Sequence, residues 1–382
     1  MTLSENNHQK HTSLARRSYG EFGEQEFAFF GTTDETIRQL FRELLVHLSP
    51  GFSVAVAGAD YPDFTPEHEQ DSIPYASLAY REDNNGSTWR SFENLNVFHR
   101  RSLFNAADLV LINGNYYPGR NRVLLIDSEN DREADVPFSD EVVMVIKMRE
   151  NEDVSLLKGL LKKEVPVFFI KDTVGIAMFI REWMKKKRPP VNGLILNGGR
   201  SLRMGEDKGS IAYHGKSQRL YLAEIMAPHC QQLYISCSDD SSRAERENIT
   251  ALADTFVNLG PYGGILSAFR HQPASAWLVV ACDLPYLSSS TLGYLLQHRR
   301  PSKVATAFRD AEGRYPEPMV AVWEPRAYLV LLEFLSQGYS CPRKVMINSD
   351  VQLLTAPDSL ELKNVNHPKE REEAMRFFNK RS

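Results

Sequence analysis

An apolar run that ends in paired glycines constrains the fold of this chain more than any other feature. The run Leu194–Leu196 leads into Asn197, Gly198 and Gly199, and the loop that follows closes on Lys208. A strand that opens into such a loop brings backbone N–H groups close to phosphate oxygens, which side chains would obstruct. Paired glycines alone also fit a surface turn. Here glycine and lysine share one window after an apolar run, so the window predicts a phosphate-binding loop.

Strand-sized apolar runs alternate with segments of helical spacing along most of the chain, which predicts α/β domains built on parallel sheets. The 382 residues exceed the usual size of one domain. The basic run Lys185–Pro190 interrupts the alternation and is typical of a solvated linker stiffened by proline. We therefore expect a polar lead-in (1–26), an α/β domain (27–187), a linker (188–190) and a second α/β domain (191–382).

Composition and charge exclude several functions. The net charge of -4 gives no general attraction to nucleic acid or to anionic membranes. Apolar runs such as Trp277–Cys282 are too short to span a bilayer, and the polar N-terminus lacks the apolar core of a signal peptide. The 4 cysteines form no Cys-x-x-Cys pair, as expected of reduced thiols. We expect a cytoplasmic protein that binds neither nucleic acid nor membrane.

An aspartate follows the most apolar strand of the second half. Asp283 comes directly after Trp277–Cys282, and ligands of open α/β sheets bind beyond the carboxyl ends of the strands. Carboxylate and phosphate oxygens together suit Mg²⁺. Asp283 could instead cap the turn before Pro285; beside a phosphate loop, the metal interpretation is favoured. Arg203 and Lys208 would neutralise the charge that phosphate oxygens carry during transfer.

Further motifs follow in order through the second half: Leu196–Gly199 with Arg203–Lys208, His214–Lys216, Gly260–Gly264, Cys282–Tyr286 and Asn364–Pro368. Together they resemble the signature of the molybdenum cofactor guanylyltransferases. The resemblance covers residues 191–382 and implies a Rossmann-like nucleotidyltransferase fold of the nucleotide-diphospho-sugar transferase type. It also implies transfer of GMP from GTP to molybdopterin, with release of pyrophosphate.

The resemblance implies roles for individual residues. The nucleotide-binding positions of the family correspond to Leu196, Asn197, Gly198, Gly199, Lys208, Asp254 and Asp283. The catalytic positions correspond to Arg203, Lys208 and Asp283, of which Asp283 would bind Mg²⁺. Asn364 and Asn366 would lie on the pterin and metal side of the cleft. The incoming phosphate is already an anionic nucleophile, so the work is alignment and charge neutralisation.

The sequence departs from this family at a few positions. Asn197 stands where the family usually has alanine, Ser236 where asparagine is common, and Ser217 where proline usually follows Gly-Lys. Asn197 is harmless if only its backbone faces the base, whereas a side chain in the pocket could change base preference. Ser236 puts a nucleoside contact there in doubt. We favour neutral variation at each position. Guanine preference depends on the resemblance of Gly198 and Gly199 to the guanylyl type.

The first domain has a loop where a P-loop would lie. Gly31 follows the predicted strand Glu26–Phe30, but Thr33, Asp34 and Glu35 occupy positions where a P-loop has glycine, lysine and Ser/Thr. Two carboxylates would repel a triphosphate. We therefore expect a degenerate P-loop-like α/β domain that has lost triphosphate binding.

The strand-sized runs Asp108–Gly114 and Val123–Asp127 give this domain a loose resemblance to the guanine dinucleotide biosynthesis adapter, a small P-loop GTP-binding protein. The resemblance implies a role in dimerisation, in substrate delivery or in docking molybdoenzymes and cofactor-insertion partners. An unrelated α/β domain fused for stability is the alternative.

Two other functions compete with guanylyl transfer. An enzyme of the same fold could use CTP or a sugar phosphate. Alternatively, the chain could be a non-catalytic carrier of molybdopterin. The carrier is disfavoured because Arg203, Lys208 and Asp283 are all present.

Overall fold

The computed structural model describes residues 13–58, 78–83, 86–91, 95–127, 141–152, 164–197, 208–237 and 249–380. The chain divides into two compact units. We call Ser18–Lys187 the N-terminal unit, and Arg188–Ser382 together with Met1–Arg17 the C-terminal unit. Among the described residues, no helix is long and apolar enough to cross a membrane.

The N-terminal unit is built on a parallel sheet with the strand order β2-β5-β1-β6-β7-β8. Its strands are β1 (Glu26–Phe30), β2 (Val54–Ala57), β5 (Leu109–Asn113), β6 (Asn121–Ile126), β7 (Val142–Lys147) and β8 (Val167–Phe169). Strands buried on both faces read as continuous apolar runs, which is why these runs are visible in the sequence. A separate antiparallel pair consists of β3 (Leu78–Asp83) and β4 (Gly86–Ser91).

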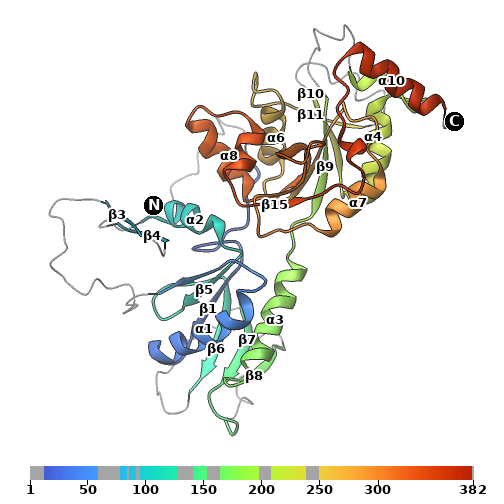
Figure 1. The fold of residues 1–382 in the computed structure, drawn as a ribbon. Helices are drawn as coiled ribbons and strands as arrows, with labels where there is room; N and C mark the ends of the chain where they lie inside the picture. The colour runs from blue at the N-terminus through green and yellow to red at the C-terminus, as the bar shows by residue number, and fades with distance from the viewer. Residues whose placement is uncertain are drawn as a thin grey trace, which may run out of the picture. The chain divides into compact units, whose positions relative to one another are not determined.

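Helices α1 (Asp34–Leu48) and α3 (Thr173–Lys186) cover one face of this sheet, as Figure 1 shows. Both present an apolar stripe to the strands; in α1 it consists of Ile37, Leu40, Phe41, Leu44 and Leu48. The short helix α2 (Val97–Leu103) and the 3₁₀ turn η3 (Phe104–Ala106) follow β4 in the chain. The leucines at 156, 157, 160 and 161 have the spacing of a helix, but they lie outside the described residues.

The C-terminal unit has a mixed sheet with the strand order β11-β10-β9-β12-β14-β13-β15. Only β14 runs antiparallel to its neighbours. The strands are β9 (Val191–Leu196), β10 (Leu233–Cys237), β11 (Thr250–Ala253), β12 (Ala276–Ala281), β13 (Ala305–Arg309), β14 (Pro316–Trp323) and β15 (Val351–Leu354). The two sheets and the helices between their strands confirm the predicted α/β class.

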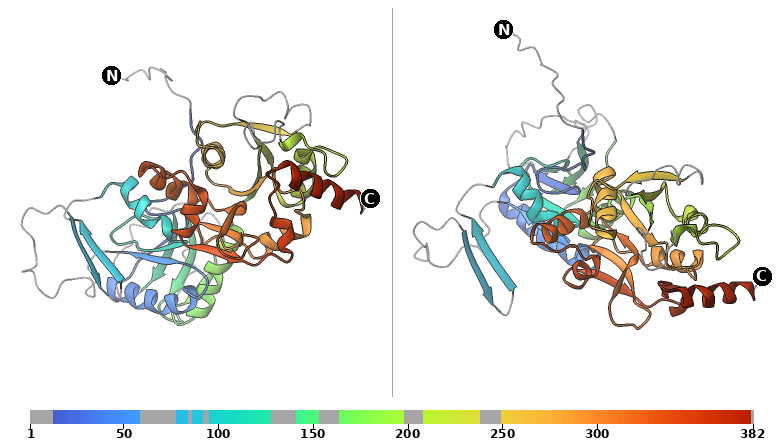
Figure 2. Two further views of the ribbon diagram at one scale, coloured as in Figure 1. Left: turned by 45° about the horizontal axis from the view of Figure 1, so that its top comes forward. Right: turned by 90° about the horizontal axis from the view of Figure 1, so that it is seen from above.

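Helices pack on both faces of this mixed sheet (Figures 1 and 2). Helices α6 (Pro261–His271), α8 (Ala327–Ser336) and α9 (Pro342–Ile347) bury one apolar core, and α4 (Gln218–Met226) and α7 (Ser289–Gln297) bury the other. The remaining elements are η5 (Lys208–Ser210), η6 (Ala227–His229), η7 (Ser359–Leu362) and the C-terminal helix α10 (Pro368–Asn379).

One helix begins earlier than the sequence pattern suggests. A helix is expected only from about Ile265, after a glycine-rich loop, but α6 begins at Pro261. Proline is favoured at the first helical position, and only Gly260 keeps a positive φ, of 55°. A Cβ on Gly264 would lie 2.8 Å from Leu196 Cδ2, so this glycine allows α6 to approach β9 closely.

The segment predicted as a linker is hydrogen-bonded to the C-terminal unit. The guanidinium of Arg299 donates to the carbonyl oxygen of Pro189 over 3.0 Å, and Ala276 N donates to that of Pro190 over 2.8 Å. Arg299 also forms a two-pronged ion pair with Glu324, at 2.6 and 2.7 Å, in which both side chains are buried. Residues 188–190 thus group with the C-terminal unit, and Arg188 and Pro190 are exposed.

Candidate active site

The carboxyl edge of the parallel strands in the C-terminal unit gathers three of the predicted site residues. Strands β11, β10, β9 and β12 lie side by side and parallel. Asn197 follows β9, Asp254 follows β11 and Asp283 follows β12. Since parallel strands end at the same edge, these residues lie where open α/β sheets bind their ligands.

Lys208 lies between two of the predicted residues. Its Nζ is 3.5 Å from Asp283 Oδ2 and 2.5 Å from Asn366 Oδ1. The lysine and aspartate side chains are 15% and 23% exposed, so water screens this pair only in part. The structure thus brings a cation, a carboxylate and an amide together from three distant segments of the chain.

Two buried acceptor atoms, on Asp283 and on the segment before Asn366, are unsatisfied among the described residues. Asp283 Oδ1 and Asn364 Oδ1 have no hydrogen-bond partner among the described residues. The adjacent Val365 N donates to the carbonyl oxygen of Asp283 over 2.8 Å, which holds the two segments together. Buried polar atoms are normally paired, so orphaned oxygens indicate a missing cation or donor. Carboxylate and amide oxygens are ligands that Mg²⁺ accepts, so this pair fits the ion.

The described residues contain no group of three His, Cys, Asp or Glu side chains that could hold a metal by themselves. That does not conflict with Mg²⁺, because this ion usually takes one or two carboxylates and completes its shell with water and substrate phosphate.

Asp254 is hydrogen-bonded to Ser236, the serine that stands where the family commonly has asparagine. Ser236 is buried, and its hydroxyl donates to Asp254 Oδ1 over 2.7 Å. Burial raises the pKa of the Asp254 carboxyl, and the hydrogen bond from Ser236 opposes that rise. The serine hydroxyl therefore orients Asp254, which is a use that the sequence pattern did not suggest.

The side chain of Asn197 is directed toward the turn that carries Lys208. Its Oδ1 lies 2.5 Å from the point that a Cβ on Gly209 would occupy, and 4.0 Å from Cys282 Sγ. The preceding residue, Leu196, is buried, and its carbonyl oxygen accepts from Cys282 N over 3.2 Å. The Asn197 amide thus fills the space beside Gly209, and Gly209 leaves room for it.

Gly198, Gly199 and Arg203 lie outside the described residues, so their nucleotide-binding and catalytic roles stay predictions. The roles of Leu196, Asn197, Lys208, Asp254, Asp283, Asn364 and Asn366 also stay predictions, although the structure now gives their positions.

Sequence reasoning missed a buried carboxylate on β14. Glu317 is 3% exposed, accepts from Met319 N over 3.0 Å and pairs with Arg343 Nη2 at 3.1 Å. Burial raises the pKa of Glu317; Arg343 opposes this and the charge of Asp283 adds to it. The signal was a glutamate between prolines at the start of an apolar strand, which is an unusual place for a charge.

In the N-terminal unit, the start of α1 is capped and hydrogen-bonded by residues of the chain itself. Thr33 caps α1, and the carboxylate of Asp34 accepts from Asn113 Nδ2 (3.1 Å), Asn115 Nδ2 (2.7 Å) and the hydroxyl of Tyr116. Gly31 adopts φ 99°, and a Cβ there would meet the Leu125 carbonyl oxygen at 2.3 Å. A carboxylate of the chain itself thus lies where a helix N-terminus would attract an external anion.

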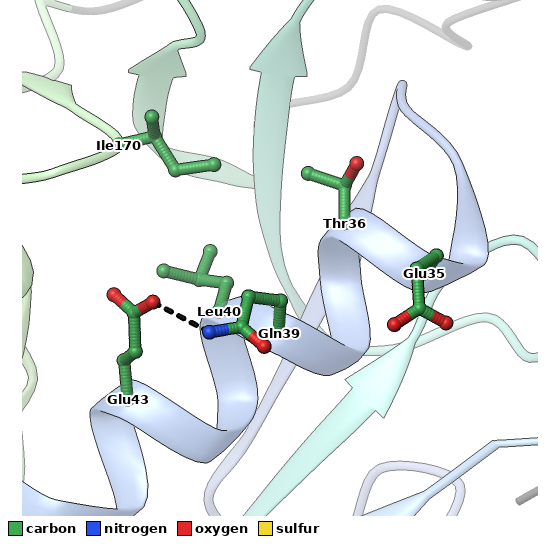
Figure 3. A pocket seen from close by; sticks show the side chains of 6 residues that line it. All are labelled: Glu35, Thr36, Gln39, Leu40, Glu43 and Ile170. Carbon is green, nitrogen blue, oxygen red and sulfur yellow. Dashed lines mark hydrogen bonds between the residues drawn. The ribbon is translucent and has the colours of Figure 1, made fainter.

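A pocket of about 280 Å³ lies along α1 (Figure 3). Gln39 donates to Glu43, one turn further along α1, over 2.8 Å. The described side chains that line the pocket include two carboxylates and no base, so it does not suit a triphosphate. They are Glu35, Thr36, Gln39, Leu40, Glu43 and Ile170.

A mixed sheet of this order, with a lysine and an aspartate at its carboxyl edge, fits the nucleotidyltransferase class. Residues 193–351 match the family described as MobA-like NTP transferase domain. A molybdenum cofactor guanylyltransferase of Pseudomonas putida is 31% identical over 188 residues, which are 47% of this chain and 95% of the relative. The chain belongs to the molybdenum cofactor guanylyltransferase family through its C-terminal unit.

Other relatives cover the same half of the chain. A molybdenum cofactor biosynthesis bifunctional protein of Synechocystis is 32% identical over 182 residues, 47% of this chain and 52% of the relative. The chain therefore spans about half the length of that relative. The solved structure of molybdopterin-guanine dinucleotide biosynthesis protein A from Archaeoglobus fulgidus matches 50% of this chain and 99% of its own, with 22% identity and a TM-score of 0.43.

Proposed function

We propose that this protein transfers GMP from GTP to molybdopterin and releases pyrophosphate. The observation that carries the proposal is the group formed by Lys208, Asp283 and Asn366, beside two unsatisfied buried oxygens. A nucleotidyltransferase needs a cation and oxygen ligands at one point of the carboxyl edge, and this group supplies both.

In the proposed reaction, an oxygen of the acceptor's terminal phosphate forms a bond to the α-phosphorus of GTP. The bond from that phosphorus to the oxygen bridging the α- and β-phosphates breaks, and pyrophosphate leaves. The nucleophile is already an anion, so the site needs no strong general base. Lys208 would orient a phosphate and neutralise part of its charge, and Asp254 would orient the nucleoside.

We propose Mg²⁺ as the cofactor, held by Asp283 and Asn364 on the basis of their orphaned oxygens. When bound, the ion would draw charge from the phosphate oxygens and hold them in place. Asn366 accepts from Lys208 Nζ and would face the acceptor. A cytoplasmic location accompanies this proposal, because the reaction consumes GTP.

The N-terminal unit would take no part in the chemistry. Asp34 at the start of α1 and the carboxylates of the α1 pocket oppose triphosphate binding there. We propose that this unit is a degenerate P-loop-like domain that docks molybdoenzymes or cofactor-insertion partners. The full chain should then bind one equivalent of GTP, and Asp283→Ala or Lys208→Ala should weaken that single event. A second event unaffected by either substitution would place a nucleotide in the N-terminal unit.

A nucleotidyl-transfer assay tests the proposed function. The full chain is incubated with molybdopterin, Mg²⁺ and α-labelled GTP or CTP, and incorporation into the acceptor is measured. GMP incorporation alone supports the proposal. CMP incorporation would indicate the cytidylyl alternative, and no incorporation would indicate a carrier. Asp283→Ala should abolish incorporation, whereas Asp350→Ala, at an exposed surface pair with Lys303, should not.

A further inference from the structure

The imidazole of His214 lies where three segments of the proposed active site meet. His214 follows the η5 turn that carries Lys208, and its Nε2 is 2.9 Å from the carbonyl oxygen of Pro285, two residues after Asp283. Since a carbonyl only accepts, Nε2 carries the proton. Burial lowers the pKa of His214, and the hydrogen bond to Pro285 opposes that shift. The hydrogen bond therefore ties the lysine segment to the aspartate segment.

Aromatic rings surround this imidazole. Its ring stacks on Tyr221 of α4 at 3.6 Å between centroids, with an interplanar angle of 10°. Phe378 of α10 lies 4.2 Å from the same imidazole and 5.4 Å from Tyr286. We call His214, Tyr221, Tyr286 and Phe378 the aromatic hub. Through Phe378, it joins the C-terminal helix to the loops that carry Lys208 and Asp283 (Figures 1 and 2 show α10 in red).

The start of α10 fixes the asparagine segment. Glu370 Oε2 accepts from Asn366 N over 2.7 Å and from His367 N over 3.0 Å. Because Asn366 Oδ1 contacts Lys208 and Val365 N binds the Asp283 carbonyl, the position of α10 sets where Asn364 and Asn366 lie. The helix and the hub thus form one connected scaffold.

A second set of contacts holds the aspartate loop at its far end. Glu361 accepts from Ser288 N over 2.8 Å and from the Ser288 hydroxyl. Gln218 Nε2 donates to the Leu284 carbonyl oxygen over 3.1 Å, and the Tyr221 hydroxyl donates to that of Leu287 over 2.8 Å. None of these contacts involves His214 or Phe378, so we expect the loop to stay folded when either of those two side chains is removed.

We propose that His214 and Phe378 are positioning residues that set the spacing between Asp283 and Asn364, and so the affinity of the divalent-cation site. This inference rests on the proposed function for its link to catalysis, but not for the cation site itself. A displacement of about 1 Å at reacting groups lowers rates by about 100-fold, so a partial shift through the hub should be measurable.

The test uses the full chain with Mn²⁺ as the probe. The concentration of free Mn²⁺ is measured by electron paramagnetic resonance, which gives the affinity of the site. His214→Ala and Phe378→Ala should each weaken Mn²⁺ binding several-fold and lower kcat for guanylyl transfer, with thermal midpoints close to that of the unmodified chain. His214→Gln places an amide N–H near the position of Nε2 and should recover most of the affinity. Glu370→Gln weakens the cap of α10 from the surface and should give a smaller effect in the same direction.

Matched controls remove an equivalent side chain elsewhere. His298→Ala removes an exposed imidazole of the same unit, and Phe334→Ala removes a half-buried ring that packs on Tyr339. Both should keep unmodified Mn²⁺ affinity. Unchanged Mn²⁺ binding in both hub variants would overturn the inference, as would absence of Mn²⁺ binding by the unmodified chain. Mn²⁺ binding without guanylyl transfer would instead contradict the proposed function and leave the hub supported.

Discussion

Lys208 Nζ lies 2.5 Å from Asn366 Oδ1, although the two residues are 158 positions apart in the chain. The contact joins the phosphate-loop lysine to the segment before the C-terminal helix. It also directs the ammonium group toward Asp283, whose Oδ2 is 3.5 Å away. The lysine is therefore preorganised at the carboxyl edge by an acceptor on either side.

Lys208→Ala should lower kcat for guanylyl transfer by about 100- to 1,000-fold, the usual cost of removing one preorganised charge-stabilising donor. Steady-state kinetics with GTP and molybdopterin measure the effect. Lys216→Ala is the matched control, because that lysine pairs with Glu224 at the surface. An equal loss of kcat in both variants would show that Lys208 has no special role in the reaction.

Gly209→Ala should impair the active site through Asn197. The added Cβ would lie 2.5 Å from Asn197 Oδ1 and 2.7 Å from Arg219 Cγ, so both side chains must move. Activity should fall, and the double variant Asn197→Ala/Gly209→Ala should recover part of it because one clash is gone. Gly215→Ala is the comparison: no atom lies within 4 Å of its Cβ position, although its φ of 71° adds strain. If the double variant is no better than Gly209→Ala, Asn197 is not the obstacle.

Asp254 should give nucleotide binding a dependence on acid pH. Burial raises the pKa of this carboxyl, so it takes up its proton at a higher pH than an exposed aspartate would. As pH falls through the raised pKa, the charged acceptor is lost and the KM for GTP should rise, while the folded state itself is favoured by the protonation. Ser236→Ala removes the hydrogen bond that lowers the pKa, so the onset should move to higher pH. Asp254→Asn should abolish this limb of the KM–pH profile; a limb that persists belongs to another group.

Glu324→Gln should destabilise the C-terminal unit by about 3–5 kcal/mol, because it leaves the buried Arg299 guanidinium without its counter-charge. The free energy of unfolding in urea measures the change. Asp350→Asn breaks the surface pair with Lys303 and should cost no more than about 1 kcal/mol. Comparable values for both variants would mean that Arg299 finds water or another acceptor.

Much of the fold could be predicted because the strands are buried on both faces. The runs Leu109–Ile112, Val123–Ile126 and Trp277–Cys282 contain almost no polar residue, so their place in a parallel sheet is visible in the sequence. The short strand β15 and helix α9 have weak patterns, because their burial depends on partners far away in the chain. The antiparallel direction of β14 follows from tertiary pairing, which local periodicity does not encode.

The candidate site was predicted in part for a similar reason. A strand end followed by Asp283 is a local signal, and parallel topology brings such ends together. The contact of Lys208 with Asn366 and the hydrogen bond from Ser236 to Asp254 depend on side-chain directions that only the folded chain defines. Glu317 was missed because its environment is set by Arg343 of α9 and by Asp283, and none of these is adjacent in sequence.

The carboxylate of Asp34 has a thermodynamic consequence for the N-terminal unit. A free anion stabilises a fold in proportion to the logarithm of its concentration, whereas an anion that is part of the chain is present at a constant effective concentration. Under the function proposed for this unit, the start of α1 would not respond to the phosphate and nucleotide concentrations around it. A rise in the melting temperature of the full chain on adding GTP would then be reported by the C-terminal unit alone, which makes heat denaturation a domain-resolved measure of nucleotide binding.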